Sequence, residues 1–404
     1  MTIDPRMRND NSNFAAPPMV AGLQRRALLA GLVFSAVSVI GFVIEPRQAF
    51  HSYLLAYMLC LGLTLGPMSL LMVWHLTGGD WGIPVRRIWE AAIATLPMTA
   101  AAFIPVALSA YLHLNYPWAD PEEIKHSVHI AHQAAQYLNP NMFLLRGIVY
   151  FVAWGILAYH LLAWSDLQDR PPERAFDVRF RALSGAGLVI YAWMLTFASI
   201  DWVMSLEPAF TSTIYGLIFV VGQGLIAMCL AVIIANVLGS REPMNEVLQT
   251  KNFLDYGNLI LTFVMLWAYF SFSQWLIVWS GNLPEEIHWF ADRIKGDWGA
   301  VGLLLIVGHF AVPFALLLSR PFKQNSRKLA WLAGWLVLMR YLDLHWNIEP
   351  NFHRASFHYS WLDAVIPIAM LALWLAYFFR NLRRRPLLVL HDPHVRAALA
   401  KQHE

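Results

Sequence analysis

Side chains that can gain and lose a proton lie inside long apolar stretches of this sequence. Asp201, Asp343 and His309 are each flanked by runs of aliphatic and aromatic residues, and Arg340 lies three residues before Asp343. Ionisable groups inside an apolar helix are costly, so they usually face a bundle interior or a water-filled cavity and serve a function. Carboxylates and imidazoles placed one after another are what a proton relay requires. The sequence therefore predicts proton transfer as the chemistry of these residues.

The candidate residues fall into two sets according to their depth in the predicted helices. Counting 1.5 Å per residue from the helix start near Arg327, Arg340 lies roughly 20 Å and Asp343 about 24 Å from the cytoplasmic side. The outer set is expected to line a polar vestibule and comprises Asp201, Glu207, Arg340, Asp343, His345 and Asp363, with His51, His113 and Glu349 nearer the outer surface. The inner set comprises His75, Glu90, His160 and His309. We predict two polar half-paths separated by an apolar middle.

Structural roles are the alternative for several of these residues. Arg340 and Asp343, three residues apart on one helix, could form a buried ion pair that holds helices together. Glu90 lies four residues after Arg86, which would suit a surface ion pair.

The histidines have alternatives of the same kind. His75 precedes Thr-Gly-Gly-Asp-Trp-Gly and could hydrogen-bond that turn, and His309 could be a core histidine with its hydrogen bonds satisfied. Asp201 is harder to explain structurally, because it is an acid one turn inside an otherwise apolar helix.

The elements that position these residues are transmembrane helices. Of the 404 residues, 58% are hydrophobic and only 14% are charged, whereas an ordinary soluble domain has about 25% charged residues. Crossing a bilayer takes about 20 apolar residues, and only a helical bundle satisfies the backbone polar groups of such blocks in lipid. We predict an all-α integral membrane protein of about ten transmembrane helices, at 26–44, 50–76, 88–114, 143–164, 182–206, 212–238, 254–280, 298–319, 328–349 and 360–380.

Both ends of the chain are predicted to lie in the cytoplasm. Of the 29 Lys and Arg residues, 22 lie in the termini and the even-numbered connections, six lie on the other side, and Arg340 lies within a helix. By the positive-inside rule, the side rich in Lys and Arg is cytoplasmic. We therefore predict a cytoplasmic tail at 1–25, a transmembrane domain at 26–380 and a cytoplasmic tail at 381–404. The net charge of +3 reflects this topology, and we expect no binding to nucleic acid.

The longest connections, 115–142 and 281–297, are both assigned to the outer side and are too short for a soluble domain. The first carries His126, His129 and His132, whose spacing spreads the first and last about 240° apart around a helix. This spacing favours an amphipathic lid over a cluster of metal ligands, and we predict no metal site.

A sequence motif recurs at two outer helix ends. Asp201 to Pro208 and Asp343 to Pro350 both read D-x5-E-P, four helices apart and in the same direction. The repeat predicts two parallel four-helix bundles, spans 2–5 and 6–9, flanked by spans 1 and 10, as in many transporters. Chance recurrence is the alternative, since Glu45-Pro46 also ends a span.

The cysteine pattern argues against redox centres in this chain. Cys60 and Cys229 lie in separate apolar spans, with no CxxC, CxxCH or ferredoxin-like run. We expect both to be small buried apolar side chains. Histidines at matching depth are few, which also disfavours a b-type haem held by two imidazoles.

Several stretches taken together resemble one family. They are Ser52-Tyr-Leu-Leu-Ala-Tyr57 with Leu76-Thr-Gly-Gly-Asp-Trp-Gly82, Asp201-Trp-Val-Met-Ser-Leu-Glu-Pro208 followed by Ser212-Thr-Ile-Tyr-Gly216, and Phe263-Val-Met-Leu-Trp-Ala-Tyr-Phe270 running to Gly281-Asn-Leu-Pro-Glu-Glu286. From about Phe50 to Arg385, the chain resembles a membrane subunit of bacterial alternative complex III, the quinol:cytochrome c oxidoreductase, of the NrfD or polysulfide-reductase type. That complex has two membrane subunits of this type, and the chain is more similar to the shorter one than to the longer one.

The resemblance implies a multi-pass protein of the bacterial inner membrane that binds no prosthetic group of its own. Its implied partners are a paralogous quinol-binding membrane subunit, an iron–sulfur subunit and haem c subunits. In that family quinol oxidation is ascribed to the longer membrane subunit, and the shorter one is proposed to help move protons. The matching motif positions here are Asp201, Glu207, Asp343 and Asp363.

The leading hypothesis is therefore a non-catalytic, proton-handling subunit of a respiratory quinol oxidoreductase. One alternative is that this chain itself binds quinol and oxidises it through an iron–sulfur partner, with Asp201, Asp343 or His345 reaching the quinol hydroxyls. Another is a secondary transporter, which the repeat favours but the shortage of Gly- or Pro-broken spans disfavours.

Overall fold

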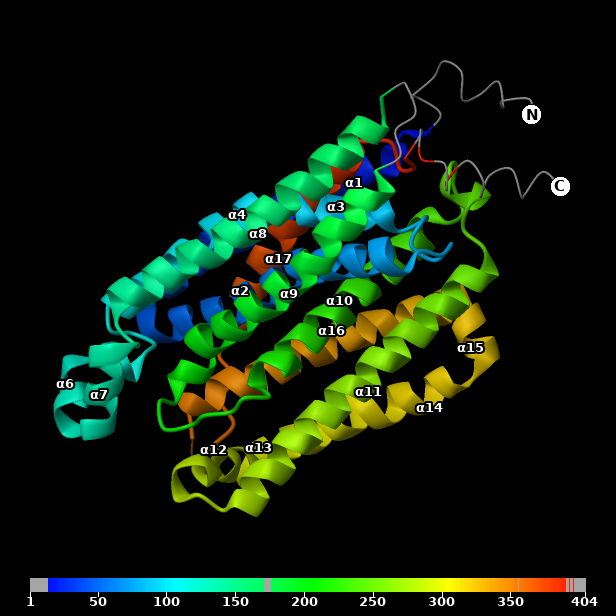
Figure 1. Ribbon diagram of the computed structural model, residues 1–404. Coiled ribbons are helices and arrows are strands. Elements are labelled where there is room, and N and C mark those ends of the chain that lie inside the picture. Colours follow the sequence, from blue (N-terminus) through cyan, green and yellow to red (C-terminus); the bar gives the residue numbers. More distant parts are fainter. Residues whose placement is uncertain (1–13, 171–175, 355, 390–391, 393–394, 396–404) are drawn as a thin grey trace, which may run out of the picture.

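The computed structural model describes residues 14–170, 176–354, 356–389, 392 and 395, and within these residues every regular element is a helix (Figure 1). Nine helices or helical segments of this part of the chain are long and apolar enough to cross a membrane. The prediction of an all-α, multi-span membrane protein is confirmed.

The membrane-spanning elements follow the predicted order. They are α1 (Pro18–Ile44), α2 (Pro46–Thr77), the consecutive α3 (Arg86–Ile93), α4 (Leu96–Ala101) and α5 (Phe103–Tyr111), α8 (Pro140–Gln168), α9 (Asp177–Trp202), α10 (Tyr215–Leu238), α11 (Thr250–Gly281), the consecutive α13 (Gly296–Leu305), η6 (Ile306–Ala311) and α14 (Val312–Leu318), and α17 (Leu362–Arg383). The span predicted at 328–349 is α16 (Ser326–Ile348). Its charged residues make it less apolar than the other nine, but 23 residues rise about 34 Å, enough to cross the bilayer core.

Short helices connect the spans. They are η3 (Pro117–Ala119), α6 (Pro121–His126), α7 (Val128–Gln136), η4 (Met204–Leu206), η5 (Met244–Glu246), α12 (Pro284–Ile294), α15 (Arg320–Gln324) and η7 (Glu349–Asn351). Local sequence fixes several helix starts: the side chains of Asp120, Ser127, Asn139 and Asn325 each accept a hydrogen bond from a backbone N–H of the first turn. At the other end of α2, Gly78 adopts a φ of 68°, which a glycine tolerates without strain.

The helices pack as two four-helix groups with a flanking pair. In the first group α2 contacts α3 and α9, and α8 contacts α5 and α9; in the second, α10 contacts α11 and α16, and α11 contacts α14. Helices α1 and α17 pack along each other, and α17 also lies against α2. This arrangement agrees with the predicted grouping of spans 2–5 and 6–9 between spans 1 and 10.

The two ends of the bundle differ in what they carry. Helices α6, α7 and α12 lie at one end, whereas the start of α1, the end of α17 and α15 lie at the other (Figure 1). The two longest connections therefore share one end, as the predicted topology requires. The end with α6, α7 and α12 is called the outer end below, following the predicted orientation.

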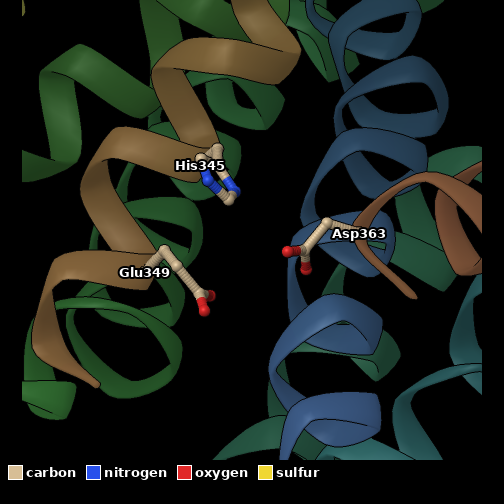
Figure 2. Close-up of side chains that lie close together, drawn as sticks. All are labelled: His345, Glu349 and Asp363. Atoms are coloured by element: carbon tan, nitrogen blue, oxygen red, sulfur yellow. The ribbon is translucent and has the colours of Figure 1, made fainter. Parts of the chain in front are cut away.

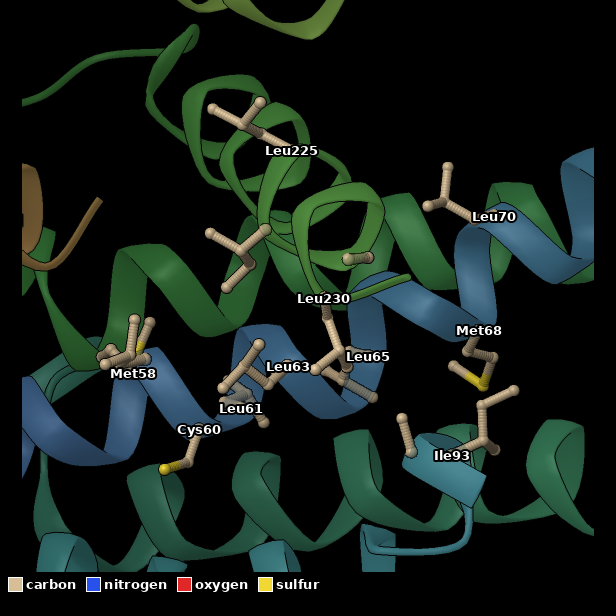
Figure 3. Close-up of a cluster of buried hydrophobic side chains, with 14 of the residues drawn as sticks. Met58, Cys60, Leu61, Leu63, Leu65, Met68, Leu70, Ile93, Leu225 and Leu230 are labelled. Carbon is tan, nitrogen blue, oxygen red and sulfur yellow. The ribbon is translucent and has the colours of Figure 1, made fainter. Parts of the chain in front are cut away.

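The contact between α2 and α10 is called the seam, because it joins the two helix groups. The apolar window of α2 is 100% buried and that of α10 is 83% buried, against 17% for α1. Leu61, Leu65 and Met68 of α2 lie in one apolar cluster with Leu225 and Leu230 of α10 (Figure 3). Cys60 is part of this cluster, and both cysteines are buried and unpaired, as expected for small apolar side chains.

Two glycines allow close approach near the seam, Gly66 of a backbone and Gly222 of a side chain. A Cβ atom at Gly66 of α2 would overlap with the backbone carbonyl of Gln223 of α10, and one at Gly222 would overlap with the guanidinium of Arg340. Small residues that allow such close approach are the usual means of packing helices in lipid. The seam therefore has no room for a larger side chain at Gly66.

The ends of the chain differ from the predicted tails where the structure describes them. Helix α1 begins at Pro18, so residues 18–25, expected in the N-terminal tail, are helical. Beyond α17, Leu387, Leu388 and Val389 are buried, and the Leu387 N–H donates to the Phe14 carbonyl at 2.8 Å. Residues 1–13, 390–391, 393–394 and 396–404 of the predicted tails lie outside the described residues.

We predict that Gly66→Ala destabilises the protein by about 1–3 kcal/mol, the usual cost of overpacking, because a backbone carbonyl cannot move aside as a side chain can. The measurement is thermal unfolding of the purified protein in mild detergent. The matched control is Gly155→Ala in α8, where a Cβ meets nothing within 4 Å and the change should be neutral or slightly stabilising. Equal melting temperatures for the two variants would contradict the packing of the seam described here.

Candidate functional site

Glu90 of α3 is the centre of a buried ionic network at the inner end. Its carboxylate pairs with Arg86 at 2.9 Å and with Arg87 at 2.5 Å, and all three side chains are at most 2% exposed. The Ser165 hydroxyl of α8 donates to the same carboxylate at 2.6 Å. The predicted pairing of Glu90 with Arg86 exists, but it is buried and not on the surface as expected, because α8 covers α3 here.

The chain beyond α17 completes this inner network. Arg86 donates to Asp392 at 2.6 Å, and Arg385 lies 2.9 Å from Asp166 and 3.6 Å from Glu90. Arg87 also pairs with Asp169 at the end of α8. Buried arginines held by several carboxylates join α3, α8 and the C-terminal segment, and removing one partner of such a set costs about 3–5 kcal/mol.

His75 lies next to this network. Its Nδ1 atom is 3.3 Å from the Ser184 hydroxyl of α9, its ring stacks on Phe180 at 4.2 Å, and its Nε2 atom has no hydrogen-bond partner. His75 therefore does not hold the turn that follows it, which was the alternative interpretation. That turn is held by Trp74, whose indole donates to the Gly79 carbonyl at 2.9 Å.

The other two residues of the predicted inner set lie elsewhere. His160 is half-buried on α8 and packs on Trp164 at 5.4 Å between ring centroids. His309 is fully buried in the π-helical segment η6, stacks on Trp267 at 4.1 Å, and lies near Arg340. The structure thus places His309 with the outer set, and neither of its ring nitrogens has a hydrogen-bond partner.

Asp201 is fully buried and bound by two residues of α8. Arg146 donates to both carboxylate oxygens, at 2.8 and 3.0 Å, and the Tyr150 hydroxyl donates at 2.6 Å. The bidentate geometry is a strong form of charge-assisted hydrogen bond. Sequence reasoning missed this pairing because Arg146 was counted among the charges of the outer side, 55 residues away along the chain.

Arg340 and Asp343 form a buried ion pair on α16, at 3% and 4% side-chain exposure. The guanidinium lies over the Phe219 ring at 5.2 Å and against Gly222 of α10. The structure therefore contains the buried ion pair that was the structural alternative for these two residues.

Three further residues of the outer end converge. One ring nitrogen of His345 and one carboxylate oxygen each of Glu349 and Asp363 all lie within 4.8 Å of one another (Figure 2). The Gln48 amide of α2 joins the two carboxylates, at 3.1 Å from Asp363 and 3.4 Å from Glu349. We call these three residues the outer triad. Sequence reasoning placed all three residues in one outer vestibule, with Glu349 nearer the outer surface, but did not predict that they converge.

Two basic side chains lie at the rim of the outer end. His353 lies 2.9 Å from Glu349, and this hydrogen bond raises the pKa of His353. Arg293 of α12 donates to the Trp346 and Asn347 carbonyls at 3.2 and 3.0 Å, which suits a cation at the C-terminal end of α16. Burial lowers the pKa of Arg293 to about 9, so it stays charged at neutral pH.

Glu207 stands apart from the other outer residues. It pairs with Arg354 at 2.5 Å, and the two side chains are 21% and 56% exposed. A partly exposed pair of this kind contributes at most about 1 kcal/mol, and its place at the surface separates it from the buried set.

The apolar core in the middle of the bundle contains two hydrogen-bonded polar groups that the sequence did not predict. The Tyr191 hydroxyl of α9 donates to the Gln223 side chain of α10 at 2.8 Å and also interacts with Ser69 of α2. A second group joins three threonine hydroxyls, with Thr64 lying 2.9 Å from both Thr95 and Thr99. Neither group contains a residue that is charged at neutral pH, so a search for ionisable residues could not find them.

The three histidines of the first outer connection do not converge. His129 and His132 bond to Gln133 and Gln136 at 2.9 and 3.0 Å on the same short helix, and His126 ends the preceding one. Within the described part of the chain, the outer triad is the sole group of three or more His, Cys, Asp or Glu residues close enough to share a metal ion.

Comparison with known proteins gives no further assignment: no family model matches the chain, and no curated protein matches it.

We predict that Asp343→Asn lowers the amount of protein in the membrane, because it leaves Arg340 as an unpaired buried charge at a cost of about 3–5 kcal/mol. The double variant Arg340→Gln with Asp343→Asn removes both charges and should restore most of the loss. The measurement is the level of tagged protein in isolated membranes and its melting temperature in detergent. A double variant as poorly accumulated as the single one would show that the ion pair is not what the single change disrupts.

Proposed function

We propose that this chain is a proton-handling membrane subunit of a respiratory quinol:electron acceptor oxidoreductase, in the inner membrane of a bacterium with both termini in the cytoplasm. In this proposal the chain carries protons between the inner and outer ends, and quinol oxidation takes place in a partner subunit.

The observation that carries the proposal is a succession of buried polar side chains along the seam. From the outer end, Asp343 pairs with Arg340, whose guanidinium rests on Gly222 beside Gln223. Gln223 is bound by Tyr191, which interacts with Ser69 of α2. Protonatable groups and hydroxyls thus reach the middle of the bundle from its outer half.

The inner half continues along α2. His75 lies six residues after Ser69, about 9 Å along the helix axis, and bonds to Ser184 of α9. Beyond it lie Arg86 and Glu90, which interact electrostatically with the His75 ring. We call the whole succession from Asp343 to Glu90 the seam route. Its members include Asp343, His75 and Glu90, which can exchange protons, together with hydroxyl and amide groups that can pass a hydrogen bond, as proton relays in membranes do.

The kind of complex is proposed from the sequence motifs. Resemblance to membrane subunits of alternative complex III favours three kinds of partner: a paralogous quinol-binding membrane subunit, an iron–sulfur subunit and haem c subunits. The chain has no cysteine run for an iron–sulfur cluster or a c-type haem, which agrees with electron transfer in the partners. A quinone or quinol would then meet the neighbouring subunit.

We predict that the tagged chain, extracted from its native membrane in mild detergent, co-purifies with iron–sulfur and haem proteins. The purified sample should show the absorption spectrum of c-type haem, and separation of this chain from its partners should leave it colourless. Mass spectrometry of the sample identifies the partners. A stable homomer that transports a solute without such partners would support the secondary-transporter alternative and overturn the proposal.

We predict that Tyr191→Phe interrupts the seam route without changing any charge. Proton release by the purified complex, and quinol turnover if the two are coupled, should fall at least about tenfold, since a positioned proton-transfer group contributes about 10²- to 10⁴-fold. The measurement is quinol oxidation and the accompanying pH change in reconstituted vesicles.

The matched control is Tyr159→Phe on α8. Tyr159 is 69% exposed on the face turned away from the bundle, so its hydroxyl is outside the seam route and the change should leave proton release at the wild-type rate. If Tyr191→Phe assembles with its partners and also releases protons at the wild-type rate, the seam route does not carry them.

A further inference from the structure

The outer triad is more deeply buried than a set of solvated charges would be. His345 and Asp363 are 0% exposed and Glu349 is 2% exposed. Figure 2 shows the three side chains directed toward one another, His345 from the end of α16, Glu349 from the start of η7 and Asp363 from the start of α17. Two carboxylates and an imidazole therefore share a small volume out of contact with water.

The imidazole of His345 has no hydrogen-bond partner on either ring nitrogen. The backbone of His358 lies close by but not at hydrogen-bonding geometry. Aromatic rings surround the imidazole, with Trp298, Phe357 and Tyr359 at 5.6 to 5.8 Å between centroids. Because nearly all buried polar groups in proteins are satisfied, an imidazole directed at two carboxylates with both nitrogens unpaired points to a missing ligand.

The carboxylates are held as metal ligands commonly are. Asp363 accepts from the Ser52 hydroxyl at 2.5 Å and from the Ser360 N–H at 2.8 Å. Glu349 is bonded by His353, and the Gln48 amide reaches both carboxylates. Outer hydrogen bonds of this kind orient the ligands of metal sites. Among the described residues, no Arg or Lys forms an ion pair with Glu349 or Asp363, and the basic side chain bonded to either carboxylate is that of His353, on Glu349.

We propose that His345, Glu349 and Asp363 bind a divalent transition-metal ion of the Zn²⁺ class. Imidazole together with carboxylate suits Zn²⁺ and its first-row neighbours, whereas Ca²⁺ and Mg²⁺ take oxygen ligands. His345 and Glu349 lie four residues apart on one face of a helix end, the spacing that brings two helical ligands to one ion. A divalent ion also balances the two carboxylates, whose mutual repulsion opposes their approach.

Access to the site is through His353. Its side chain is 35% exposed and is bonded to Glu349, so it connects the buried triad to the outer surface. The spacing of His126, His129 and His132 led us to expect no metal site in the chain. The proposed ion site departs from that expectation. It does not depend on the proposed function, because binding is measured without turnover and the triad is not part of the seam route.

The test uses Zn²⁺ as the probe and the detergent-purified protein with the partners it retains. The sample is treated with chelator, incubated with Zn²⁺, separated from free metal, and analysed by plasma mass spectrometry for metal bound per chain. The wild type should bind one Zn²⁺ more than the His345→Gln variant. His345→Gln, Glu349→Gln and Asp363→Asn should each weaken binding at least about tenfold.

The control removes exposed histidines that could bind Zn²⁺ adventitiously. The double variant His129→Gln with His132→Gln should keep the wild-type affinity of the triad site. Each triad variant is compared with the wild type by elution profile, so that loss of metal is not confused with loss of fold.

A second measurement needs no variant. X-ray absorption at the zinc edge of the loaded wild type should report a shell of imidazole nitrogen and carboxylate oxygen. A shell with thiolate or with oxygen alone, wild-type affinity in His345→Gln, or no Zn²⁺ retained by the wild type would each overturn the proposal.

Discussion

Pairing of buried charges is the constraint on which the arrangement of these helices depends. A charged side chain inside the bilayer is costly unless a partner from the protein compensates it. Glu90 is compensated by two arginines of its own helix and by Arg385 beyond α17, and Asp201 by Arg146 of the neighbouring helix. Because Arg146 and Arg385 come from other parts of the chain than the carboxylates they pair with, satisfying these charges also constrains which segments are neighbours.

Other buried polar groups have atoms without a hydrogen-bond partner or lack an Arg or Lys to pair with. His75, His309 and His345 are buried with one or both ring nitrogens unpartnered, and Glu349 and Asp363 face each other across a shared amide. A buried ring nitrogen left without a partner costs stability. All of these groups except His309 are ones on which the proposed proton transfer or the proposed ion site rests.

The positions of the helices could be predicted from the sequence, because each span is long, apolar and bounded by polar residues. For example, α2 at Pro46–Thr77 and α10 at Tyr215–Leu238 lie where their hydropathy predicts. The sequence was also sufficient to single out Asp201, because an acid within an apolar helix is costly wherever its partner lies. The sequence did not predict which residue pairs with each buried charge. Arg146 reaches Asp201 across 55 residues of chain, and pairing over such a separation depends on how the helices pack.

The polar groups in the middle of the bundle were missed for a different reason. Tyr191, Gln223 and Thr64 are neutral, and in a sequence they are indistinguishable from residues that bond only to their own helix. Thr64 does bond to the Cys60 carbonyl of its own helix, and its additional bonds to Thr95 and Thr99 arise only because α3 and α4 lie alongside α2. Only the packed structure separates the two cases.

The close packing of the seam also bears on the choice between a proton-handling subunit and a secondary transporter. A transporter that works by alternating access moves one helix group against the other about a central site, and such movement needs an interface that can slide or open. Here Gly66 of α2 lies against the Gln223 carbonyl of α10, and Tyr191 of α9 bonds to the Gln223 side chain, so a displacement large enough to open the seam would break both contacts. A proton, by contrast, crosses by exchange between fixed hydrogen-bonded groups and needs no opening. The close contact at Gly66 and the Tyr191–Gln223 bond therefore favour the proposed proton-handling role over the secondary-transporter alternative.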